Sequence, residues 1–271
     1  MTDETPAVEL RDVTKRFRSP DGSVYTALRD LSMTVAPGEF CAVVGPTGCG
    51  KSTTLSLVSG LETASAGTVH IDGVPVTGID PRVGFMFQSD AVFPWKTVLE
   101  NVAAGPRYHG ASTRDARTAA REWIARVGLA GFEDRYPYQL SGGMRKRVAL
   151  AQSLINGPRI LLMDEPFSAL DVQTRSLMEN ELLGLWSSTS ASVVFVTHDL
   201  EEAISMSDRV FVITAAPGTV KSNYKVDLPR PRNVAEIRFQ PRFTEIYEEI
   251  WNDLRDEVLV SYERQKRSGA A

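Results

Sequence analysis

The stretch FCAVVGPTGCGKSTTLSLV, from Phe40 to Val58, decides the fold. Its apolar start is typical of a strand buried on both faces, and its end is typical of a helix. Between them, GPTGCGKS matches the spacing G-x-x-x-x-G-K-S, in which glycines let backbone N–H groups turn inward and cradle phosphates. Lys51 lies at a helix N-terminus, where the helix dipole disfavours a cation unless an anion binds there, and Ser52 can reach Mg²⁺. An ordinary glycine turn that happens to hold Lys-Ser is the alternative, but the flanking strand and helix favour a nucleotide-binding loop.

On both sides of this stretch the chain alternates between strand and helix patterns. Residues 7–40 read as strands, and GTVHIDGVPV alternates around Asp72-Gly73, a good hairpin signal. After residue 157, short apolar runs and helices alternate, which predicts a parallel sheet with helices on both faces. Residues of about 90–157 instead favour helices and read as an insertion into this α/β core. In that segment apolar residues recur at helical spacing, at Ala116, Ala120, Trp123, Ile124 and Val127.

Composition sets broad limits on the function. The 271 residues are 42% hydrophobic and 24% charged with a net charge of −4, so a sizeable core is available and nothing global indicates nucleic-acid binding. The two cysteines, Cys41 and Cys49, have no metal-site spacing and form no disulfide framework, which fits a reduced, cytosolic compartment. We expect no signal peptide, because MTDETPAVEL is acidic and lacks an apolar stretch, and no span of the membrane, because no apolar run approaches ~18 residues.

Polar residues end several of the predicted strands. Asp164 and Glu165 follow ILLM, His198 follows SVVFVT, and Gln88 follows GFMF. Ligands of open α/β sheets bind at the carboxyl ends of the strands, so these side chains are candidates for a nucleotide site. Asp164 would join the Mg²⁺ shell and Glu165 would face the attacking water. Each has a plainer alternative: a charged strand end in solvent, a structural histidine, or an unremarkable glutamine.

A second helix start, LSGGMRKRVAL from Leu140 to Leu150, also has anion-binding features. Ser141 followed by Gly142 and Gly143 leaves the start of a helix without side-chain bulk. A serine-capped helix with a basic exposed face would explain Ser141, but not two successive glycines, which weaken a helix start unless close approach is needed.

The phosphate loop, Gln88, LSGGM, LLMDEP, SALD and VTHD follow one another in an order and at distances that resemble the ATP-binding cassette (ABC) ATPases, from about Val8 to Leu228. The resemblance implies a RecA-like P-loop NTPase core with an antiparallel β subdomain and an inserted α-helical subdomain. It also implies that two cassettes meet head to tail. Ser141, Gly142 and Gly143 of each cassette would then face the γ-phosphate of the ATP bound to its partner, where a helix N-terminus suits an anion.

Motif matching carries further roles to this chain as implications of the resemblance. Phe17 matches the aromatic residue that stacks on adenine, with Tyr25 as a weaker candidate, and His198 matches the histidine that contacts the γ-phosphate. Lys146 and Gln152 depart from the family pattern, in which glutamine and arginine are common there. The remaining implied residues are Gly45, Pro46, Thr47, Gly48, Cys49, Gly50, Lys51, Ser52 and Thr53 for ATP; Glu165, His198 and Gln88 for catalysis; Ser52, Gln88 and Asp164 for Mg²⁺; and Ser168 and Asp171 for a loop that crosses to the other cassette.

The resemblance also predicts the domain organisation. An ABC ATPase domain would span residues 1–230, and residues 231–271 would form a linker and a C-terminal helix. The linker LPRPRNVAEIRFQPR is rich in proline and arginine. The last helix is expected to dock through one apolar face, formed by Phe243, Ile246, Tyr247, Ile250, Trp251 and Leu254.

Among ABC ATPases, the chain most resembles the ATPase subunits of the nitrate, sulfonate and taurine importers. It has one cassette, and DAVFPWKTVLENV, YPYQLSGGMRKRVALAQ, LMDEPFSALDVQTR and VDLPRPR carry the likeness. The implied function is ATP hydrolysis that drives uptake of a small solute, at the cytoplasmic face of the cell membrane. The implied partners are a second ATPase subunit forming a homodimer, two permease subunits and an extracytoplasmic solute-binding protein. A non-transport ABC ATPase acting on a soluble macromolecule is the alternative, and intact Glu165 and His198 disfavour a cassette that only binds ATP.

Phe93 and Trp95, in AVFPWKTV, have two readings. They are either core residues of the helical insertion or part of the groove that, in the family, receives a helix from the permease. An exposed apolar patch usually marks an interface.

Overall fold

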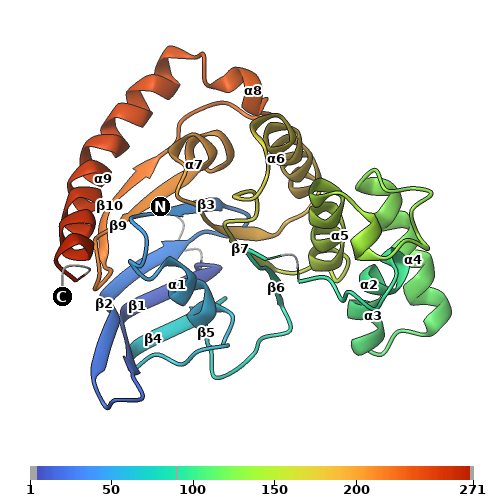
Figure 1. Cartoon of the computed structure of the whole chain (residues 1–271), viewed down its shortest axis with the longest axis horizontal. Coiled ribbons are helices and arrows are strands. Elements are labelled where there is room, and N and C mark those ends of the chain that lie inside the picture. Colours follow the sequence, from blue (N-terminus) through green and yellow to red (C-terminus); the bar gives the residue numbers. More distant parts are fainter. Residues whose placement is uncertain (1–4, 90, 269–271) are drawn as a thin grey trace. The chain divides into compact units, whose positions relative to one another are not determined.

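The computed structural model describes residues 5–89 and 91–268, and the chain divides into two compact units (Figure 1). The first unit comprises Met1–Asp80 together with Ser192–Ala271, and the second comprises Pro81–Ala191. The strand and helix patterns of the sequence are confirmed as a mixed α/β fold with a parallel and an antiparallel sheet.

An antiparallel sheet forms one part of the first unit, in the order β2-β1-β4-β5. Val8 pairs with Val35 on one side and with Ile71 on the other. The predicted hairpin at Asp72-Gly73 is confirmed: both residues have positive φ, 48° and 75°, the conformation that a two-residue type I′ turn requires. The strands are β1 (Val8–Arg18), β2 (Val24–Val35), β4 (Ala66–Ile71) and β5 (Val74–Pro75).

A second group of strands in the first unit has the order β10-β9-β3-β8. β3 (Phe40–Val44) runs parallel to both β8 and β9, and every residue of β3 is buried, which explains its uninterrupted apolar sequence. β10 pairs antiparallel with β9. The other elements of this group are β8 (Ser192–Val196), β9 (Arg209–Ile213), β10 (Val220–Lys225), α1 (Lys51–Val58), α7 (Leu200–Met206), α8 (Val234–Ile237) and α9 (Pro241–Ser268).

The second unit combines a parallel strand pair with helices. β6 (Val83–Met86) and β7 (Ile160–Asp164) pair with Met86 opposite Met163. Four of the apolar positions predicted for the helical segment, Ala116, Ala120, Ile124 and Val127, are buried in one cluster, and Trp123 packs against it partly buried. The helices are α2 (Val98–Val102), α3 (Ala104–Tyr108), α4 (Thr113–Arg126), η1 (Pro137–Gln139), α5 (Gly142–Leu154) and α6 (Val172–Ser187).

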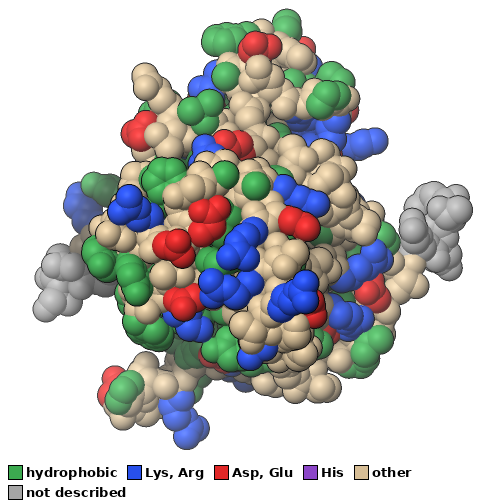
Figure 2. All heavy atoms as spheres, turned by 90° about the vertical axis from the view of Figure 1, so that its right-hand side faces the viewer, with side chains coloured by type: hydrophobic (Ala, Val, Ile, Leu, Met, Phe, Trp, Pro, Cys, Tyr) green, Lys and Arg blue, Asp and Glu red, His purple; other side chains and the backbone are tan. Residues whose placement is uncertain are grey.

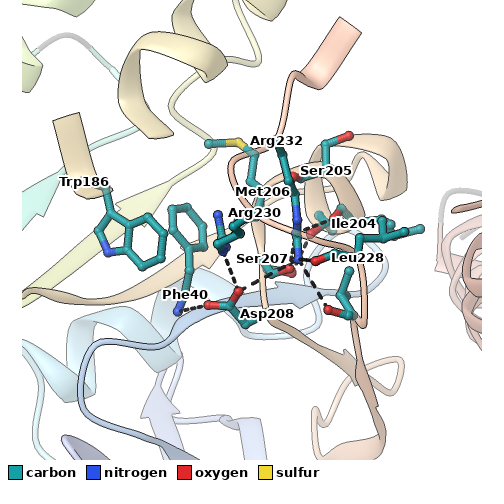
Figure 3. Close-up of polar contacts among 12 residues, drawn as sticks. Phe40, Trp186, Ile204, Ser205, Met206, Ser207, Asp208, Leu228, Arg230 and Arg232 are labelled. Atoms are coloured by element: carbon teal, nitrogen blue, oxygen red, sulfur yellow. Dashed lines mark hydrogen bonds and ion pairs between the residues drawn. The ribbon is translucent and has the colours of Figure 1, made fainter. Parts of the chain in front are cut away.

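The linker before α8 is held by a buried arginine (Figure 3). The guanidinium group of Arg232, a residue only 7% exposed, donates hydrogen bonds to main-chain carbonyls. Desolvation lowers its pKa to about 10, and the nearby charge of Arg230 acts in the same direction. The carbonyls are those of Ile204 (3.2 Å), Ser205 (3.3 Å), Ser207 (2.6 Å), Val226 (3.3 Å) and Leu228 (3.0 Å), so the linker satisfies acceptors at the end of α7.

The last helix, α9, contacts α7, β9 and β10 (Figure 1). Most of its predicted docking face is buried, including Phe243, Ile246, Ile250 and Leu254. Tyr247 is half-buried, and Trp251, which is 41% exposed, is the least buried residue of this face.

Candidate functional site

The glycine loop joins β3 to α1 and forms a cradle. Gly48 and Gly50 have φ of 78° and 100°, a region that favours glycine. A Cβ at Gly50 would lie 2.5 Å from Leu28 Cδ2, whereas one at Gly48 would meet nothing within 4 Å. Gly50 is the N-cap of α1, and no described side chain caps that helix. Its first N–H groups are therefore available to an anion.

The ammonium group of Lys51 is hydrogen-bonded to the backbone of this loop. Its Nζ donates to the carbonyl oxygens of Gly45 at 2.9 Å and Pro46 at 3.1 Å, and the residue is only 7% exposed. A buried cation beside uncapped N–H groups fits a polyphosphate, because the negative phosphates stabilise both the ammonium group and the positive end of the helix dipole. The loop therefore fits the phosphates of a nucleotide.

The two cysteines are free and buried. Burial raises the pKa of the Cys49 thiol, although the Lys51 charge lowers it in part, and burial raises the pKa of Cys41 well above its ordinary value. Both thiols are therefore neutral at physiological pH, and Cys49 acts as a small packing residue inside the loop.

His198 lies at the same edge of the first unit as the phosphate loop. It follows β8, which runs parallel to β3 with Val43 opposite Val196. Thr197 and Asp199 fix the backbone on either side: Thr197 Oγ1 donates to Glu202 Oε2 at 2.5 Å, and Asp199 Oδ1 caps α7. The exposed His198 side chain therefore stands at a fixed position beside the carboxyl end of β3.

The two aromatic candidates for adenine, Phe17 and Tyr25, face each other across the β1–β2 pair. Phe17 is half-buried beneath Lys15, whose Nζ is 4.8 Å from the ring centroid. Tyr25 is 48% exposed, and its hydroxyl donates to the carbonyl of Gly48 at 3.2 Å. Tyr25 thus touches the phosphate loop directly. The sequence alone did not predict this contact, which depends on where β2 places Tyr25 relative to the loop.

The predicted carboxylates of the second unit follow β7, next to Gln88. β6 and β7 are parallel, so their carboxyl ends meet, and Gln88 Nε2 is 3.4 Å from Glu165 Oε2. Glu165 has a φ of 43°, a left-handed conformation that costs a residue with a side chain about 1–3 kcal/mol. Such strain is typical of functional positions.

Lys146 is a residue whose contact the sequence did not predict. It is 3% exposed, and its Nζ donates to the backbone carbonyl of Gln88 at 2.7 Å. The sequence gave no signal for this contact, because Lys146 stands between Arg145 and Arg147 in what reads as a basic exposed face.

The start of α5 lacks side-chain bulk, with Ser141 exposed and Gly142 and Gly143 half-buried. Ser141 is the N-cap, and its Oγ accepts from Met144 N at 3.3 Å, as expected for a serine-capped helix. A Cβ at Gly142 would have only the guanidinium of Arg145 nearby, at 3.8 Å, and one at Gly143 would lie 3.2 Å from Thr174 Cγ2. Neither glycine has a positive φ. Nothing within the described chain therefore requires glycine at Gly142.

Ser168 and Asp171 make local contacts in the loop before α6. Ser168 Oγ donates to the carbonyl of Glu165 at 3.0 Å. Asp171 is the exposed N-cap of α6 and accepts from Thr174 N at 3.0 Å, and hydrogen bonds from Thr174 lower its pKa. A local capping role thus accounts for Asp171 without a second chain.

Ser52, Gln88 and Asp164 supply hydroxyl, amide and carboxylate oxygens, the donors that Mg²⁺ prefers. Among residues 5–89 and 91–268, no group of three or more histidines, cysteines or acids is placed to hold a metal. Oxygen donors of these kinds fit a hard cation such as Mg²⁺, which keeps part of its coordination shell for water and phosphate oxygens.

Phe93 and Trp95 border two hollows of the second unit. Trp95 is 70% exposed and is not a core residue, while Phe93 is half-buried. Buried Asn101 shapes the segment between them, because its Oδ1 accepts from Phe93 N at 2.7 Å and its Nδ2 donates to the carbonyl of Lys96 at 3.0 Å. The aromatic groove, of about 420 Å³, includes Phe85, Phe87, Phe93, Gln152, Ser153 and Asn156 in its lining. The cationic cavity, of about 610 Å³, includes Trp95, Lys96, Glu100, Arg107, Tyr108 and Arg117.

The cationic cavity carries an excess of positive charge. Its carboxylate, Glu100, already accepts from Thr97 N at 2.9 Å in the cap of α2. Lys96 Nζ lies 4.6 Å from the Phe93 ring centroid and 5.7 Å from that of Tyr108. Arg117 forms no ion pair among the residues that the structure describes. Figure 2, which faces the right-hand side of Figure 1, shows lysine and arginine side chains near the middle of that surface, with aspartate and glutamate side chains among them.

No helix in the described ranges has the length and apolar character needed to cross a membrane.

Comparisons with known proteins agree on one family. A family model described as ABC transporter matches residues 28–168. An uncharacterized ABC transporter ATP-binding protein of Methanocaldococcus jannaschii is 45% identical over 94% of this chain and 93% of its own length. The nitrate import ATP-binding protein NrtD of Synechocystis sp. is 40% identical over 92% of this chain and 95% of its own. A solved ATP-binding cassette, a dimer in a post-hydrolysis state with ADP and Pi, matches with a TM-score of 0.73 at 33% identity, covering 82% of this chain and 100% of that one.

Proposed function

The chain belongs to the ABC transporter family, and we propose that it is the ATP-hydrolysing subunit of an importer, coupled to partner permease subunits. The observation that supports ATP binding is the phosphate loop, with Lys51 buried beside the uncapped start of α1. Relatives named for import of nitrate, aliphatic sulfonates and taurine support import of a small anionic or zwitterionic solute. The subunit would act at the cytoplasmic face of the cell membrane and work with an extracytoplasmic solute-binding protein.

In this proposal each candidate residue has a defined chemical task. Lys51 and the N–H groups at the start of α1 bind the phosphates, and Tyr25 or Phe17 stacks on the adenine. Ser52, Gln88 and Asp164 hold Mg²⁺, which neutralises charge on the phosphates when bound. Glu165 accepts a proton from the attacking water, and His198 contacts the γ-phosphate.

We propose that two copies of the chain form a head-to-tail dimer. Ser141, Gly142 and Gly143 of one copy would contact the ATP held by the phosphate loop of the other. The open space beside Gly142 supports this, because glycine there serves no need of its own chain. Ser168 and Asp171 would lie in the loop that crosses to the partner.

Glu165→Gln tests the chemical step. The variant should keep ATP binding but lose about 10²–10⁴-fold in turnover, because the amide cannot accept the proton. It should also accumulate as an ATP-bound dimer in size-exclusion chromatography. Glu122→Gln removes an exposed carboxylate of the same unit and is the matched control. Turnover of Glu165→Gln within a few-fold of the wild type would show that another residue acts on the water.

We propose that the aromatic groove and the cationic cavity together receive a permease segment. Aromatic and arginine side chains are enriched at the centres of protein interfaces. Phe93 of the aromatic groove and Trp95 of the cationic cavity are neighbours, with ring centroids 5.8 Å apart. The excess of Lys96, Arg107 and Arg117 over Glu100 favours a segment that places carboxylates over the cationic cavity.

Two sets of variants test this docking. Replacement of Phe93 and Trp95 by Ser should abolish transport and co-purification of detergent-solubilised permease subunits. The melting temperature of the isolated subunit should change little. Phe239→Ser, an 81% exposed aromatic outside both hollows, is the control. Arg117→Glu should weaken co-purification more than Arg121→Glu, an exposed arginine on the same helix. Recovery of a soluble macromolecule in place of permease subunits would favour the non-transport alternative.

A further inference from the structure

The phosphate loop packs against a turn that lies far along the chain, between β9 and β10. A Cβ at Gly218 in this turn would lie 2.0 Å from the carbonyl oxygen of Cys49, so the two backbones are in direct contact. A Cβ at Gly45 would lie 2.9 Å from the carbonyl oxygen of Ile213, at the start of the same turn. Residues 213–218, named here the brace turn, therefore form one wall of the phosphate loop, and any displacement of this wall changes the space available to the loop.

The same turn is tied to the strand on its other side. Gly218 N donates to the carbonyl of Ala27 at 2.8 Å, and Arg29 N donates to the carbonyl of Gly218 at 2.9 Å. Leu28, between these two residues, lies against Gly50 of the phosphate loop. The brace turn and β2 thus enclose the loop together.

The C-terminal helix holds the outer side of the brace turn. Glu257 Oε2 accepts from Ala215 N at 2.9 Å, and the guanidinium group of Arg264 donates to the carbonyl of Ala216. Glu257 Oε1 also pairs with Lys221 Nζ at 3.1 Å, and the Glu257 side chain is only 16% exposed. The contacts to Ala215 and Ala216 join side chains of α9 to the backbone of the turn, so they do not depend on the turn's own side chains.

A further contact fixes α9 against β10. Asp253 Oδ2 accepts from Ser222 Oγ at 2.6 Å and from the Tyr224 hydroxyl at 2.7 Å. The helix is therefore attached to β10 one turn before Glu257. This attachment determines where the carboxylate of Glu257 stands relative to the brace turn.

We propose that Glu257 and Arg264 are positioning residues for nucleotide binding, which act on the phosphate loop through the brace turn. No nucleotide contact by α9 is required. When Ala215 N and the carbonyl of Ala216 are held, the backbone of Gly218 stays against Cys49 and the cradle keeps its shape. When they are released, the cradle samples wider conformations, and part of the binding free energy is spent on ordering it again.

Nucleotide affinity and thiol labelling test the proposal on the whole chain. Glu257→Ala should weaken ADP binding about three- to tenfold by isothermal titration calorimetry, the scale expected when the net contribution of one ordinary hydrogen bond is lost. Glu257→Gln keeps a carbonyl oxygen that can accept from Ala215 N, so it should restore most of the affinity. Glu263→Ala, an exposed carboxylate of the same helix, should leave the affinity unchanged. Titration of the wild type measures nucleotide binding itself, so failure of the ATPase proposal would be recognised separately.

The two buried cysteines distinguish local loosening from general instability. Iodoacetamide labelling without nucleotide, followed by peptide mass spectrometry, should show Cys49 reacting several-fold faster in Glu257→Ala, with Cys41 unchanged. Equal acceleration at Cys41, or a lowered melting temperature with unchanged ADP affinity, would mean that Glu257 only stabilises the fold and would overturn the proposal. If Glu257→Ala does not fold, Arg264→Ala replaces it, because Arg264 is exposed and its removal leaves the core of α9 intact. ADP affinity and the labelling rates of Cys49 and Cys41 are then measured on Arg264→Ala and interpreted in the same way.

Discussion

The two glycine-bearing helix starts, at α1 and at α5, use similar residues in opposite surroundings. At α1 the glycines are required by the chain itself, since Gly50 has a φ of 100° and lies against Leu28. At α5 Gly142 has an ordinary φ and open space beside it. At α1 the cation, Lys51, is buried on backbone carbonyls, whereas at α5 the serine cap is exposed.

This difference separates two reasons for a glycine. Where the backbone conformation or close packing of the chain demands a glycine, the folded chain alone explains the residue. Where neither demands it, the reason for the glycine is sought in a contact with another molecule. The glycines at the start of α1 are explained by the backbone of their own unit, whereas we propose that Gly142 at the start of α5 faces the surface of another molecule.

Mixed dimers test whether the two starts complete each other across subunits. Lys51→Ala breaks the phosphate loop, and Ser141→Arg blocks the start of α5 with bulk and charge. When the two changes are on different subunits, both defects fall in one shared site and the other site stays intact. When one subunit carries both, neither site is intact. With Glu165→Gln in every subunit, the first dimer should retain more ATP after gel filtration, and greater retention by the second would refute the shared site.

Alanine at each glycine tests the two reasons directly. Gly50→Ala should destabilise the isolated chain by about 3 kcal/mol, because it combines a left-handed φ with a close contact. Gly142→Ala should leave stability unchanged or raise it by up to ~1 kcal/mol, since alanine is the better helix former. Chemical denaturation measures both. Gly142→Ala should nevertheless reduce ATP-dependent dimerisation, and a loss of monomer stability there would show that the chain does need this glycine.

Lys146→Met tests whether the hydrogen bond from α5 to the Gln88 carbonyl keeps Gln88 in place for catalysis. The substitution keeps the apolar stem but removes the donor to the Gln88 carbonyl, so Gln88 and Glu165 should be less well ordered. We expect ATP turnover to fall about tenfold, equivalent to ~1.4 kcal/mol, with ADP affinity nearly unchanged. Lys146→Gln, the residue common in the family, should retain more activity. A parallel loss of turnover in Arg114→Met, an exposed cation on α4, would mean that charge alone matters.

Lowering the pH should weaken the N-cap of α6 and leave the N-cap of α5 unchanged. Asp171 caps α6, and its pKa is lowered by hydrogen bonds from Thr174, whereas the cap of α5, Ser141, does not titrate. Because the folded pKa is depressed, this stabilisation is fully present above the unfolded value of about 4 and is lost as pH falls through the folded pKa. Urea denaturation at pH 6 and pH 3 should show a slightly smaller acid-induced loss in Asp171→Asn than in the wild type. An identical loss would mean that the cap is already free in the folded chain.

Sequence periodicity and turn chemistry predicted the local structure well. The β3–loop–α1 unit, the Asp72-Gly73 hairpin and the buried positions of α4 depend on neighbours along the chain, and the structure confirms them. Trp251, predicted on the docking face, is 41% exposed, because periodicity along a helix does not report how deeply each residue of a face is buried.

Contacts between distant segments were beyond such reasoning. Tyr25 on Gly48, Lys146 on Gln88 and Gly218 on Cys49 join residues that are far apart in sequence. Each depends on strand register or on backbone packing, neither of which a single sequence displays. The catalytic and ATP-binding roles of the candidate residues stay predictions that the experiments above address.

The buried arginine of the linker has a consequence for how this protein can change over evolution. Arg232 recognises five main-chain oxygens and no side chain of those residues. Substitutions at Ile204, Ser205 or Val226 therefore leave its ligands in place, whereas lysine at position 232 would lose the planar fork that reaches several carbonyls at once. In a set of descendant sequences, we expect this arginine to be invariant while its neighbours drift independently of it. A search for co-varying positions would then find no signal here, although the contact ties the linker to the end of α7.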